Sequence, residues 1–268
     1  MIYFKENIQM TQEKHNKENI EKFHELLGHK NQTEIRLIAQ KVGKEQPKAQ
    51  SEFANSKEEF VDICIKNSGI DNVYAGLNER CASGTTAKDV ITINLVGIDL
   101  DSKTKPATEE DILLVIETAK SLSNELKERF DADASIDLSG NGCHVLQPEP
   151  ITEVNDENRI ELNEKIKQFC RELNKKYETD KIKIDTTGDL PRIFRVTGTY
   201  NLKSNSISKF LVYNKRQESQ KLLDYILSIK IEEELKEAEV SELIEIENDS
   251  EKIFEDFEGF KIKDYKLK

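Results

Sequence analysis

Cysteine is scarce in this sequence, and its four cysteines stand far apart with no Cys-x-x-Cys pair. A zinc site or a disulfide framework is therefore not expected, and a reducing cytoplasm is the default compartment. No apolar run approaches the roughly 18 residues of a membrane span, and the polar N-terminus has no signal-peptide core. The sequence also has no internal repeat. These absences predict a cytoplasmic, globular protein that makes no membrane contact.

Positive charge is in deficit, because 52 acidic residues outnumber 40 basic ones and give a formal net charge of −12. Residues 216–268 alone hold 16 acidic and 9 basic side chains, which is more than half of the excess. Phosphate binding depends on clustered charge rather than on total charge. The acidity therefore argues mildly against DNA binding and does not exclude a local basic groove on the first 215 residues.

Strands and helices are mixed without a regular βαβ repeat, which favours an α+β fold over a doubly wound sheet. The clearest helix begins after Thr108, a good N-cap that is followed by three acidic residues. We divide the chain into a polar N-terminal extension (1–30) that is helical or frayed, a central domain (31–215) and a helical, acidic C-terminal tail (216–268). The expected strands are 33–39, 72–80, 89–101, 181–184, 193–196 and 209–213, with a hairpin at 134–147 and helices at 57–65, from 109, at 162–177 and beyond 220.

Asp99 and Asp101 stand at the end of the most convincing strand, which is rich in Val and Ile. Residues i and i+2 of a strand project from the same face, so the two carboxylates point together. Such carboxylates raise each other's proton affinity unless a cation lies between them, and Mg²⁺ or Mn²⁺ is the natural occupant. The alternative is a strand end followed by a solvated acidic turn. Glycosyltransferases also use Asp-x-Asp with a metal, so this motif alone does not name the reaction.

A glycine-rich turn, Ser139-Gly140-Asn141-Gly142, lies directly before Cys143 and His144. Gly140 and Gly142 permit a tight turn and let the backbone approach a ligand closely. Ser139 and backbone N–H groups would hold phosphate oxygens, and His144 would donate to a triphosphate or move a proton. The alternative is an ordinary hairpin with a half-buried histidine. The remaining histidines lie in the polar N-terminal region and are expected at the surface: His15, His24 and His29.

The segment from Asp185 to Lys203 holds carboxylates followed by a cluster of cations. Asp185 follows a strand-like run and would supply a third metal-facing carboxylate; Asp189 is an alternative ligand, though Asp185 fits a strand end better. Arg binds phosphate oxygens through a bidentate fork whereas Lys acts as a point charge, so the mixture suits a triphosphate clamp. The alternative to a clamp is that these basic residues form the solvent-exposed face of a strand. The clamp candidates are Arg192, Arg195, Asn201 and Lys203.

The order of the three segments resembles the archaeo-eukaryotic primase (AEP) superfamily, especially the primase-polymerases of plasmids, phages and mobile elements. Their pattern is an Asp-x-Asp/Glu strand, then Ser-Gly-x-Gly-x-His, then an Asp followed by Arg-x-x-Arg-x-x-Gly-Thr-x-Asn-x-Lys. The resemblance covers roughly residues 30–215, so the central domain would be the catalytic domain. The matching residues are Asp99, Asp101, Ser139 to His144, Asp185, Arg192, Arg195, Gly198, Thr199, Asn201 and Lys203.

This resemblance implies an N-terminal α/β module packed on an RRM-like module, with the active site in the cleft between them. It implies a template-dependent DNA primase and polymerase that uses NTPs or dNTPs on single-stranded DNA through a two-metal nucleotidyl transfer. Asp99, Asp101 and Asp185 would hold two Mg²⁺ or Mn²⁺ ions. The nucleotide would be bound by Ser139, Gly140, Gly142, His144, Arg192, Arg195, Asn201 and Lys203, with His144 also in the catalytic set. The four cysteines do not provide the zinc-binding stem of some relatives, and the resemblance takes in no helicase module.

Two other functions compete with this interpretation. The chain is either a non-catalytic initiator that keeps the fold to bind single-stranded DNA, or a metal-dependent enzyme that acts on nucleotides without a template. The acidic tail is a separate question, since Phe254, Phe257 and Phe260 stand at three-residue intervals in it. We expect this segment to dock on a helicase or a single-strand-binding protein, and the alternative is that the rings pack on the chain's own domain.

Overall fold

The computed structural model describes residues 14–40 and 46–231, and the chain divides into a unit of residues 1–229 and a second unit of residues 230–268. No helix among the described residues is long and apolar enough to cross a membrane. The helices are α1 (Lys17–Leu27), α2 (Lys57–Asn67), α3 (Glu109–Phe130), α4 (Arg159–Tyr177), α5 (Gln220–Ser228) and the short 3₁₀ helix η1 (Ala87–Asp89). The strands are β1 (Thr33–Ile38), β2 (Ala49–Ala54), β3 (Asn72–Gly76), β4 (Thr92–Ser102), β5 (Ser135–Leu138), β6 (Gly142–Glu153), β7 (Ile182–Ile184), β8 (Ile193–Arg195), β9 (Tyr200–Asn201), β10 (Ser206–Ile207) and β11 (Lys209–Val212).

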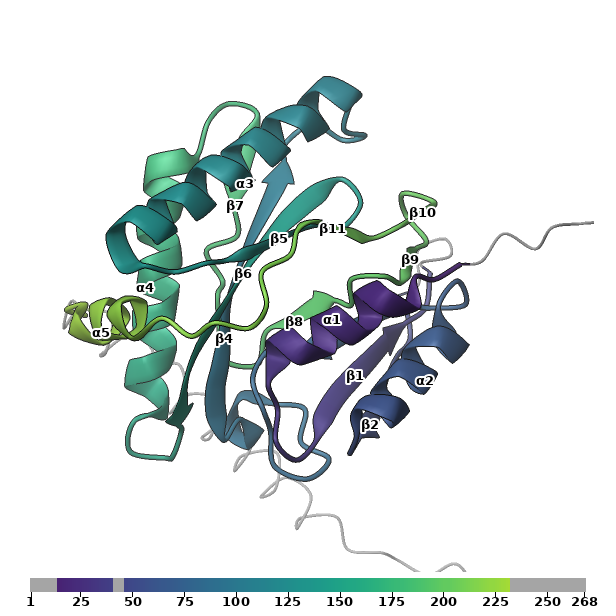
Figure 1. Cartoon of the computed structure of the whole chain (residues 1–268), viewed down its shortest axis with the longest axis horizontal. Coiled ribbons are helices and arrows are strands. Elements are labelled where there is room, and N and C mark those ends of the chain that lie inside the picture. The colour runs from purple at the N-terminus through teal and green to yellow at the C-terminus, as the bar shows by residue number, and fades with distance from the viewer. Residues whose placement is uncertain (1–13, 41–45, 232–268) are drawn as a thin grey trace, which may run out of the picture. The chain divides into compact units, whose positions relative to one another are not determined.

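The larger sheet has the order β11-β5-β6-β4-β7, and every neighbouring pair in it is antiparallel (Figure 1). The expected hairpin at residues 134–147 is confirmed, because β5 and β6 pair directly across the turn. The register of β4 against β6 places Asp99 opposite His144. Two of the three sequence segments are therefore neighbours in one sheet.

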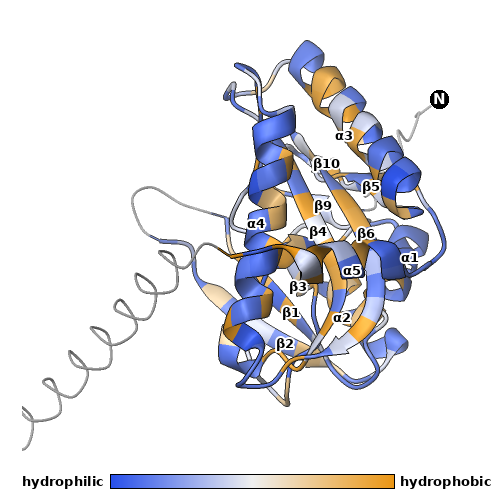
Figure 2. Cartoon of the chain, turned by 90° about the vertical axis from the view of Figure 1, so that its left-hand side faces the viewer, coloured by the Kyte–Doolittle hydropathy of each residue, from blue (hydrophilic) through white to orange (hydrophobic). Residues whose placement is uncertain are grey.

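Helices α3, α4 and α5 cover one face of the larger sheet and close a hydrophobic core against it. The expected start of α3 is confirmed, since the Thr108 hydroxyl caps the helix and Asp111 returns a bond to the cap, which completes a capping box. Val115, Ala119 and Leu122 then recur at helical spacing and are fully buried. Figure 2 shows the result: α3 and α4 present mostly hydrophilic residues outward, while the strands behind them carry hydrophobic ones.

The smaller sheet has the order β2-β1-β3-β8, and it is antiparallel throughout. Strands β1 to β3 come from the N-terminal part of the chain, whereas β8 arrives more than a hundred residues later. A second hydrophobic core joins this sheet and helices α1 and α2 to Leu95 and Leu146 of the larger sheet. The two sheets approach closely at Gly97, where an added Cβ would lie 2.6 Å from both Leu77 and Phe194.

Three expectations from the sequence differ from the structure in the N-terminal part. Residues 1–30 contain helix α1, in line with the expected helical character, but α1 does not belong to a separate extension, because Ile20 and Phe23 are buried in the second core. His24 and His29 are not surface residues, because the first packs on Phe60 with ring centroids 4.9 Å apart and the second is partly buried. The ring of His29 lies 2.9 Å from the Thr33 hydroxyl and 3.2 Å from the Leu77 carbonyl, and burial lowers its pKa to about 4.

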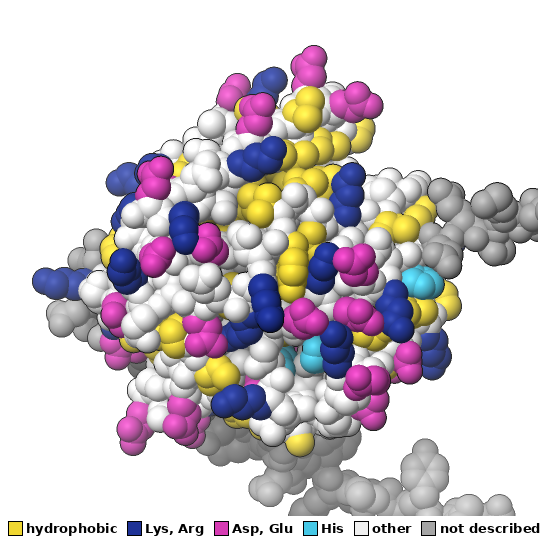
Figure 3. Space-filling view, in the orientation of Figure 1, with side chains coloured by type: hydrophobic (Ala, Val, Ile, Leu, Met, Phe, Trp, Pro, Cys, Tyr) yellow, Lys and Arg dark blue, Asp and Glu magenta, His cyan; other side chains and the backbone are white. Residues whose placement is uncertain are grey.

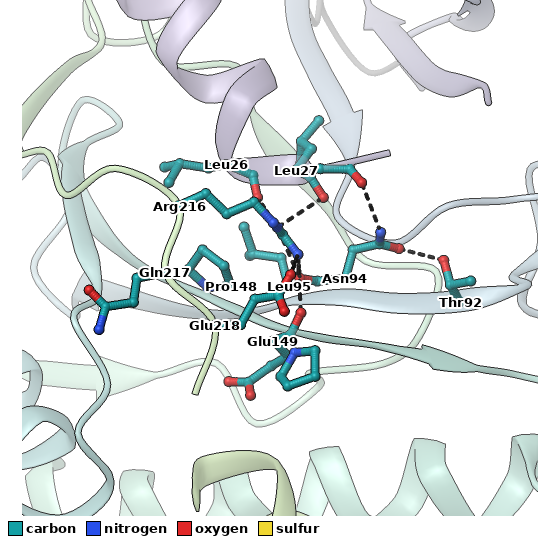
Figure 4. Close-up of polar contacts among 12 residues, drawn as sticks. Leu26, Leu27, Thr92, Asn94, Leu95, Pro148, Glu149, Arg216, Gln217 and Glu218 are labelled. Atoms are coloured by element: carbon teal, nitrogen blue, oxygen red, sulfur yellow. Dashed lines mark hydrogen bonds and ion pairs between the residues drawn. The ribbon is translucent and has the colours of Figure 1, made fainter. Parts of the chain in front are cut away.

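The predicted acidic tail also begins inside the folded unit. Arg216 donates to the carbonyl oxygens of Leu26 at 2.5 Å, of Glu149 at 3.1 Å and of Asn94 at 3.3 Å (Figure 4). Helix α1 ends there in a left-handed Gly28, so its last carbonyls lack partners within the helix and face the guanidinium. Arg216 thus joins α1, β4 and β6. The phenylalanines expected to dock on a partner, at 254, 257 and 260, lie outside the described residues.

Candidate active site

A cavity of about 350 Å³ lies where the two sheets meet, and all three sequence segments contribute to its lining. The larger sheet supplies Asp99 and Asp101 from β4 and His144 from β6, while the smaller sheet supplies Tyr74 and Arg195. Opposite charges therefore line one cavity. The remaining lining residues are Ser102, Thr104, Lys105, Pro106, Ser139, Asn141, Gly142, Asn201 and Lys203.

The acidic wall follows the alternation expected of a strand. Asp99 and Asp101 are partly exposed on one face of β4, and Leu100 between them is buried on the other. Burial raises the pKa of Asp99 to about 6; the neighbouring His144 opposes this rise, and the carboxylates of Asp101 and Asp185 add to it. Gly142 makes room for this wall, since an added Cβ there would lie 2.5 Å from the Asp101 carboxylate.

His144 stands between two carboxylates of adjacent strands. Its Nδ1 lies 2.9 Å from Asp137 Oδ1, and its Nε2 lies 3.9 Å from Asp99 Oδ1. The ring stacks on Phe194 of the smaller sheet with centroids 4.2 Å apart. Burial disfavours the imidazolium, but the two carboxylates outweigh that effect, so the pKa of His144 is raised. The structure therefore places an imidazole whose cationic form is favoured by two carboxylates beside the acidic wall.

Asp137 is the main site residue that the sequence analysis missed. It is fully buried, and it accepts hydrogen bonds from the His144 backbone N–H at 3.3 Å and from the Thr197 hydroxyl. The signal was available, because a hairpin with its turn at Ser139–Gly142 pairs residue 137 with residue 144. A buried carboxylate opposite a histidine orients the ring and stabilises its charge.

Ser139, Asn141 and Gly142 of the glycine turn line the cavity, whereas Gly140 does not. Gly140 has φ +144°, and an added Cβ would lie 2.3 Å from the Asn201 side-chain nitrogen. Asn201 donates to the Ser139 carbonyl at 2.7 Å and accepts from the Lys203 backbone N–H at 2.9 Å. Asn201 was predicted to bind the nucleotide, and the structure uses its amide to hold the turn and the Lys203 loop together.

The basic wall centres on Arg195, which is 4% exposed. Its Nη2 donates to Asn72 Oδ1 and to the Tyr74 hydroxyl, each at 3.0 Å, and its guanidinium lies over the Tyr74 ring. Nη1 is buried and makes no hydrogen bond with any described residue. A buried cation with an unused donor is costly unless an anion reaches it, so this group fits a ligand oxygen.

The structure does not bring Arg192 and Asp185 into the cavity lining. Arg192 lies 3.2 Å from Asp185 Oδ2 and 2.9 Å from Asp189 Oδ1, so the predicted clamp residue pairs with both candidate third carboxylates. Asp185 also accepts from the Thr187 backbone N–H at 2.9 Å. It is nevertheless beside the acidic wall, since its backbone N–H donates to the Asp99 carbonyl.

A likeness to solved structures identifies this arrangement. The AEP domain of the cyanophage S-2L primase-polymerase superposes with a TM-score of 0.51 at 11% identity, over 80% of this chain and 99% of that one. The chain has the fold of an AEP primase-polymerase domain. The expected α+β class is confirmed with it. Neither a protein-family model nor a curated protein sequence matches the chain.

Two further solved structures resemble this primase-polymerase fold at lower scores. One is the catalytic domain of the primase Repb′ in complex with initiator DNA, with a TM-score of 0.48, 14% identity, and coverage of 79% of this chain and 90% of that one. The other is the polymerase domain of Mycobacterium tuberculosis Ligase D in complex with DNA. Its TM-score is 0.44 at 12% identity, over 79% of this chain and 86% of that one.

The acidic wall of this AEP fold suits a divalent cation in its donor chemistry. Asp99 and Asp101 offer hard carboxylate oxygens in one cavity, and this donor chemistry suits a divalent cation. Within the described residues, no three His, Cys, Asp or Glu side chains are grouped as a metal site. Of the three carboxylates expected to hold metal, Asp99 and Asp101 line the cavity, and Asp185 pairs with Arg192.

Proposed function

We propose that this protein is a template-dependent DNA primase and polymerase that transfers nucleotidyl groups on single-stranded DNA. One observation carries the proposal: the cavity joins two carboxylates to a buried arginine that has an unused N–H donor. A metal-bound triphosphate needs both kinds of group at once. The fold of an AEP primase-polymerase domain supports the same function.

Two Mg²⁺ or Mn²⁺ ions would be held by Asp99, Asp101 and Asp185. Asp185 would first have to break its ion pair with Arg192. Such ions, when bound, lower the pKa of an attacking hydroxyl and offset charge on the triphosphate. Arg195 and Lys203 would bind phosphate oxygens, Arg192 would join them once it is free of Asp185, and His144 would donate from Nε2. Ser139, Gly140 and Gly142 would offer the turn to the same phosphates, and Asn201 would keep that turn in place.

The layout inferred for the chain follows from these roles. We assign the larger sheet with its helices to the RRM-like module and the smaller sheet with α1 and α2 to the N-terminal module. The nucleotide would enter where they meet, and the DNA template would lie along the same opening. Figure 3 shows basic and acidic side chains interspersed over the face that carries α3 and α1. Individual cations on this face, and no continuous basic patch, would therefore contact DNA. We also infer cytoplasmic activity and retain a helicase or single-strand-binding protein as the partner of residues 216–268.

Nucleotide incorporation on single-stranded DNA tests this function. Reactions with and without an annealed primer would contain Mg²⁺ or Mn²⁺ and either NTPs or dNTPs. The variant Asp101→Ala removes one cavity carboxylate, and Asp180→Ala removes an exposed one as a matched control. We expect products with the wild type and with Asp180→Ala, and a loss of at least about 100-fold with Asp101→Ala.

The outcomes separate the candidates. Products without a primer indicate a primase, and extension only from a primer indicates a polymerase. Nucleotide turnover that ignores added DNA would favour an enzyme without a template. If the wild type and Asp101→Ala are equally inert while both bind single-stranded DNA, the enzyme assignment fails and the initiator leads.

A further inference from the structure

We propose that Asn72, which does not line the cavity, is a positioning residue that sets both cationic arms of the triphosphate site. The inference rests on the proposed function. It assigns a role to a side chain on β3 that lies outside all three sequence segments. The arms are the Arg195 guanidinium and the loop that carries Lys203.

The Asn72 amide is 3% exposed and uses both of its polar atoms. Its Oδ1 accepts from Arg195 Nη2 at 3.0 Å and from the Leu202 backbone N–H at 3.2 Å. Its Nδ2 donates to the Ile38 carbonyl of β1 at 3.3 Å. Asn72 Oδ1 therefore bonds both to Arg195 of β8 and to the loop that carries Lys203. The bond from Nδ2 to β1 holds the amide in this orientation.

A neutral amide suits this place better than a carboxylate. Asn72 orients Arg195 without cancelling its charge, so the unused Nη1 keeps its full attraction for a phosphate oxygen. A carboxylate at the same position would form an ion pair with the guanidinium and compete with the phosphate. The bond to Leu202 also sets the position of Lys203, whose own backbone N–H is held by Asn201.

Two variants and a matched control test the role. Asn72→Ala removes the shared oxygen, Asn72→Asp keeps an acceptor but adds a charge, and Asn94→Ala removes another fully buried amide whose partners lie outside the cavity. Binding of inorganic tripolyphosphate and of a dNTP, each with Mg²⁺, would be measured by calorimetry. We expect both Asn72 variants to bind both probes about tenfold more weakly. Asn94→Ala should bind within about twofold of the wild type while its Tm falls.

Hydrogen exchange provides a readout that does not depend on activity. The Leu202 amide should lose protection in Asn72→Ala and keep it in Asn94→Ala, because only the first variant removes its acceptor. In steady-state incorporation, Asn72→Ala should raise the KM for the nucleotide more than it lowers kcat. In an Arg195→Lys background, its effect on binding should shrink to less than threefold, since the two residues act as a unit.

The results distinguish this inference from the function on which it rests. Wild-type affinity in Asn72→Ala, or an equal loss in Asn94→Ala, overturns the positioning role while the enzyme assignment stands. If the wild type itself binds neither probe and incorporates nothing, the proposed function fails and takes the inference with it. Stronger binding by Asn72→Asp than by Asn72→Ala would contradict the argument about charge.

Discussion

Glu149 is the most anomalous single residue outside the site. Its side chain on β6 is fully buried, and neither carboxyl oxygen has a hydrogen-bond partner among the described residues. Burial raises its pKa to about 9, against the opposing effect of Arg216. The group is therefore a neutral acid at physiological pH, although its backbone carbonyl accepts from Arg216.

The pH dependence of stability should follow from Glu149. A folded-state pKa of about 9 against an ordinary 4.5 means that the folded chain binds the extra proton between these values, so its stabilising contribution falls as pH rises through them. Glu149→Gln fixes the neutral form. Urea unfolding should show equal stability near pH 5 and a gain of about 1–3 kcal/mol for the variant at pH 8. A pH-independent difference would contradict the argument.

Asp137 should control the protonation of His144. Replacing Asp137 by Asn removes the nearest carboxylate from the imidazole but keeps the shape of the side chain. Because that carboxylate favours the imidazolium, the pKa of His144 should fall. NMR titration of the metal-free protein measures this directly, with Asp133→Asn, which lies outside the cavity lining, as the control. An unchanged pKa in Asp137→Asn would show that Asp137 only supports the strand.

The residues found from the sequence are those that a local pattern exposes. Asp99 and Asp101 were predicted from strand alternation, and the glycine turn from its composition. The two carboxylates line the cavity together with Ser139, Asn141 and Gly142 of the turn. The local sequence predicted neither the role of Asn72 nor the pairing of Arg192 with Asp185. Asn72 contacts Arg195, which lies more than a hundred residues away in the sequence. Arg192 pairs with a carboxylate although a phosphate was expected, and no local pattern distinguishes these two anions.

Among helices and strands, too, the elements with local sequence signals were predicted, and those that depend on tertiary contacts were not. Helix α3 and the β5–β6 hairpin form from local signals, namely a capping box and a glycine turn, and both were predicted. Strand β2 was missed because its exposed, polar sequence has no strand pattern and takes its conformation from pairing with β1. The placement of β8 beside β3 likewise needs the tertiary fold.

Arg216 should be essential to the junction of α1, β4 and β6. Arg216→Ala leaves the carbonyls of Leu26, Asn94 and Glu149 without their donor, so we expect a loss of about 2–4 kcal/mol in unfolding free energy. Arg216→Lys should recover only part of it, because one ammonium does not reproduce the fork. Chemical denaturation measures both. Lys221→Ala, an exposed control, should change stability by less than about 0.5 kcal/mol.

At the scale of the whole molecule, the folded unit runs further in both directions than the sequence indicated. Composition suggested boundaries at residues 30 and 215 because polar and acidic residues dominate beyond them. Burial contradicts composition at both ends, since α1 contributes Ile20 and Phe23 to one core and α5 contributes Leu222 and Ile226 to the other. Helix α1 is mostly polar by count, and α5 is followed by an acidic segment, so average composition conceals the side chains that pack.

Truncation at two points tests where the unit ends. A chain of residues 1–229 keeps every element described here, so its Tm should lie within about 2 °C of the full chain and its nucleotide incorporation should be unchanged. A chain of residues 1–215 loses Arg216 and the buried Leu222, Leu223 and Ile226. Each loss of a buried apolar side chain costs about 2–5 kcal/mol, which together approaches or exceeds the total stability of a domain. It should therefore fail to melt cooperatively, whereas cooperative melting of 1–215 near the Tm of the full chain would restore the boundary read from composition.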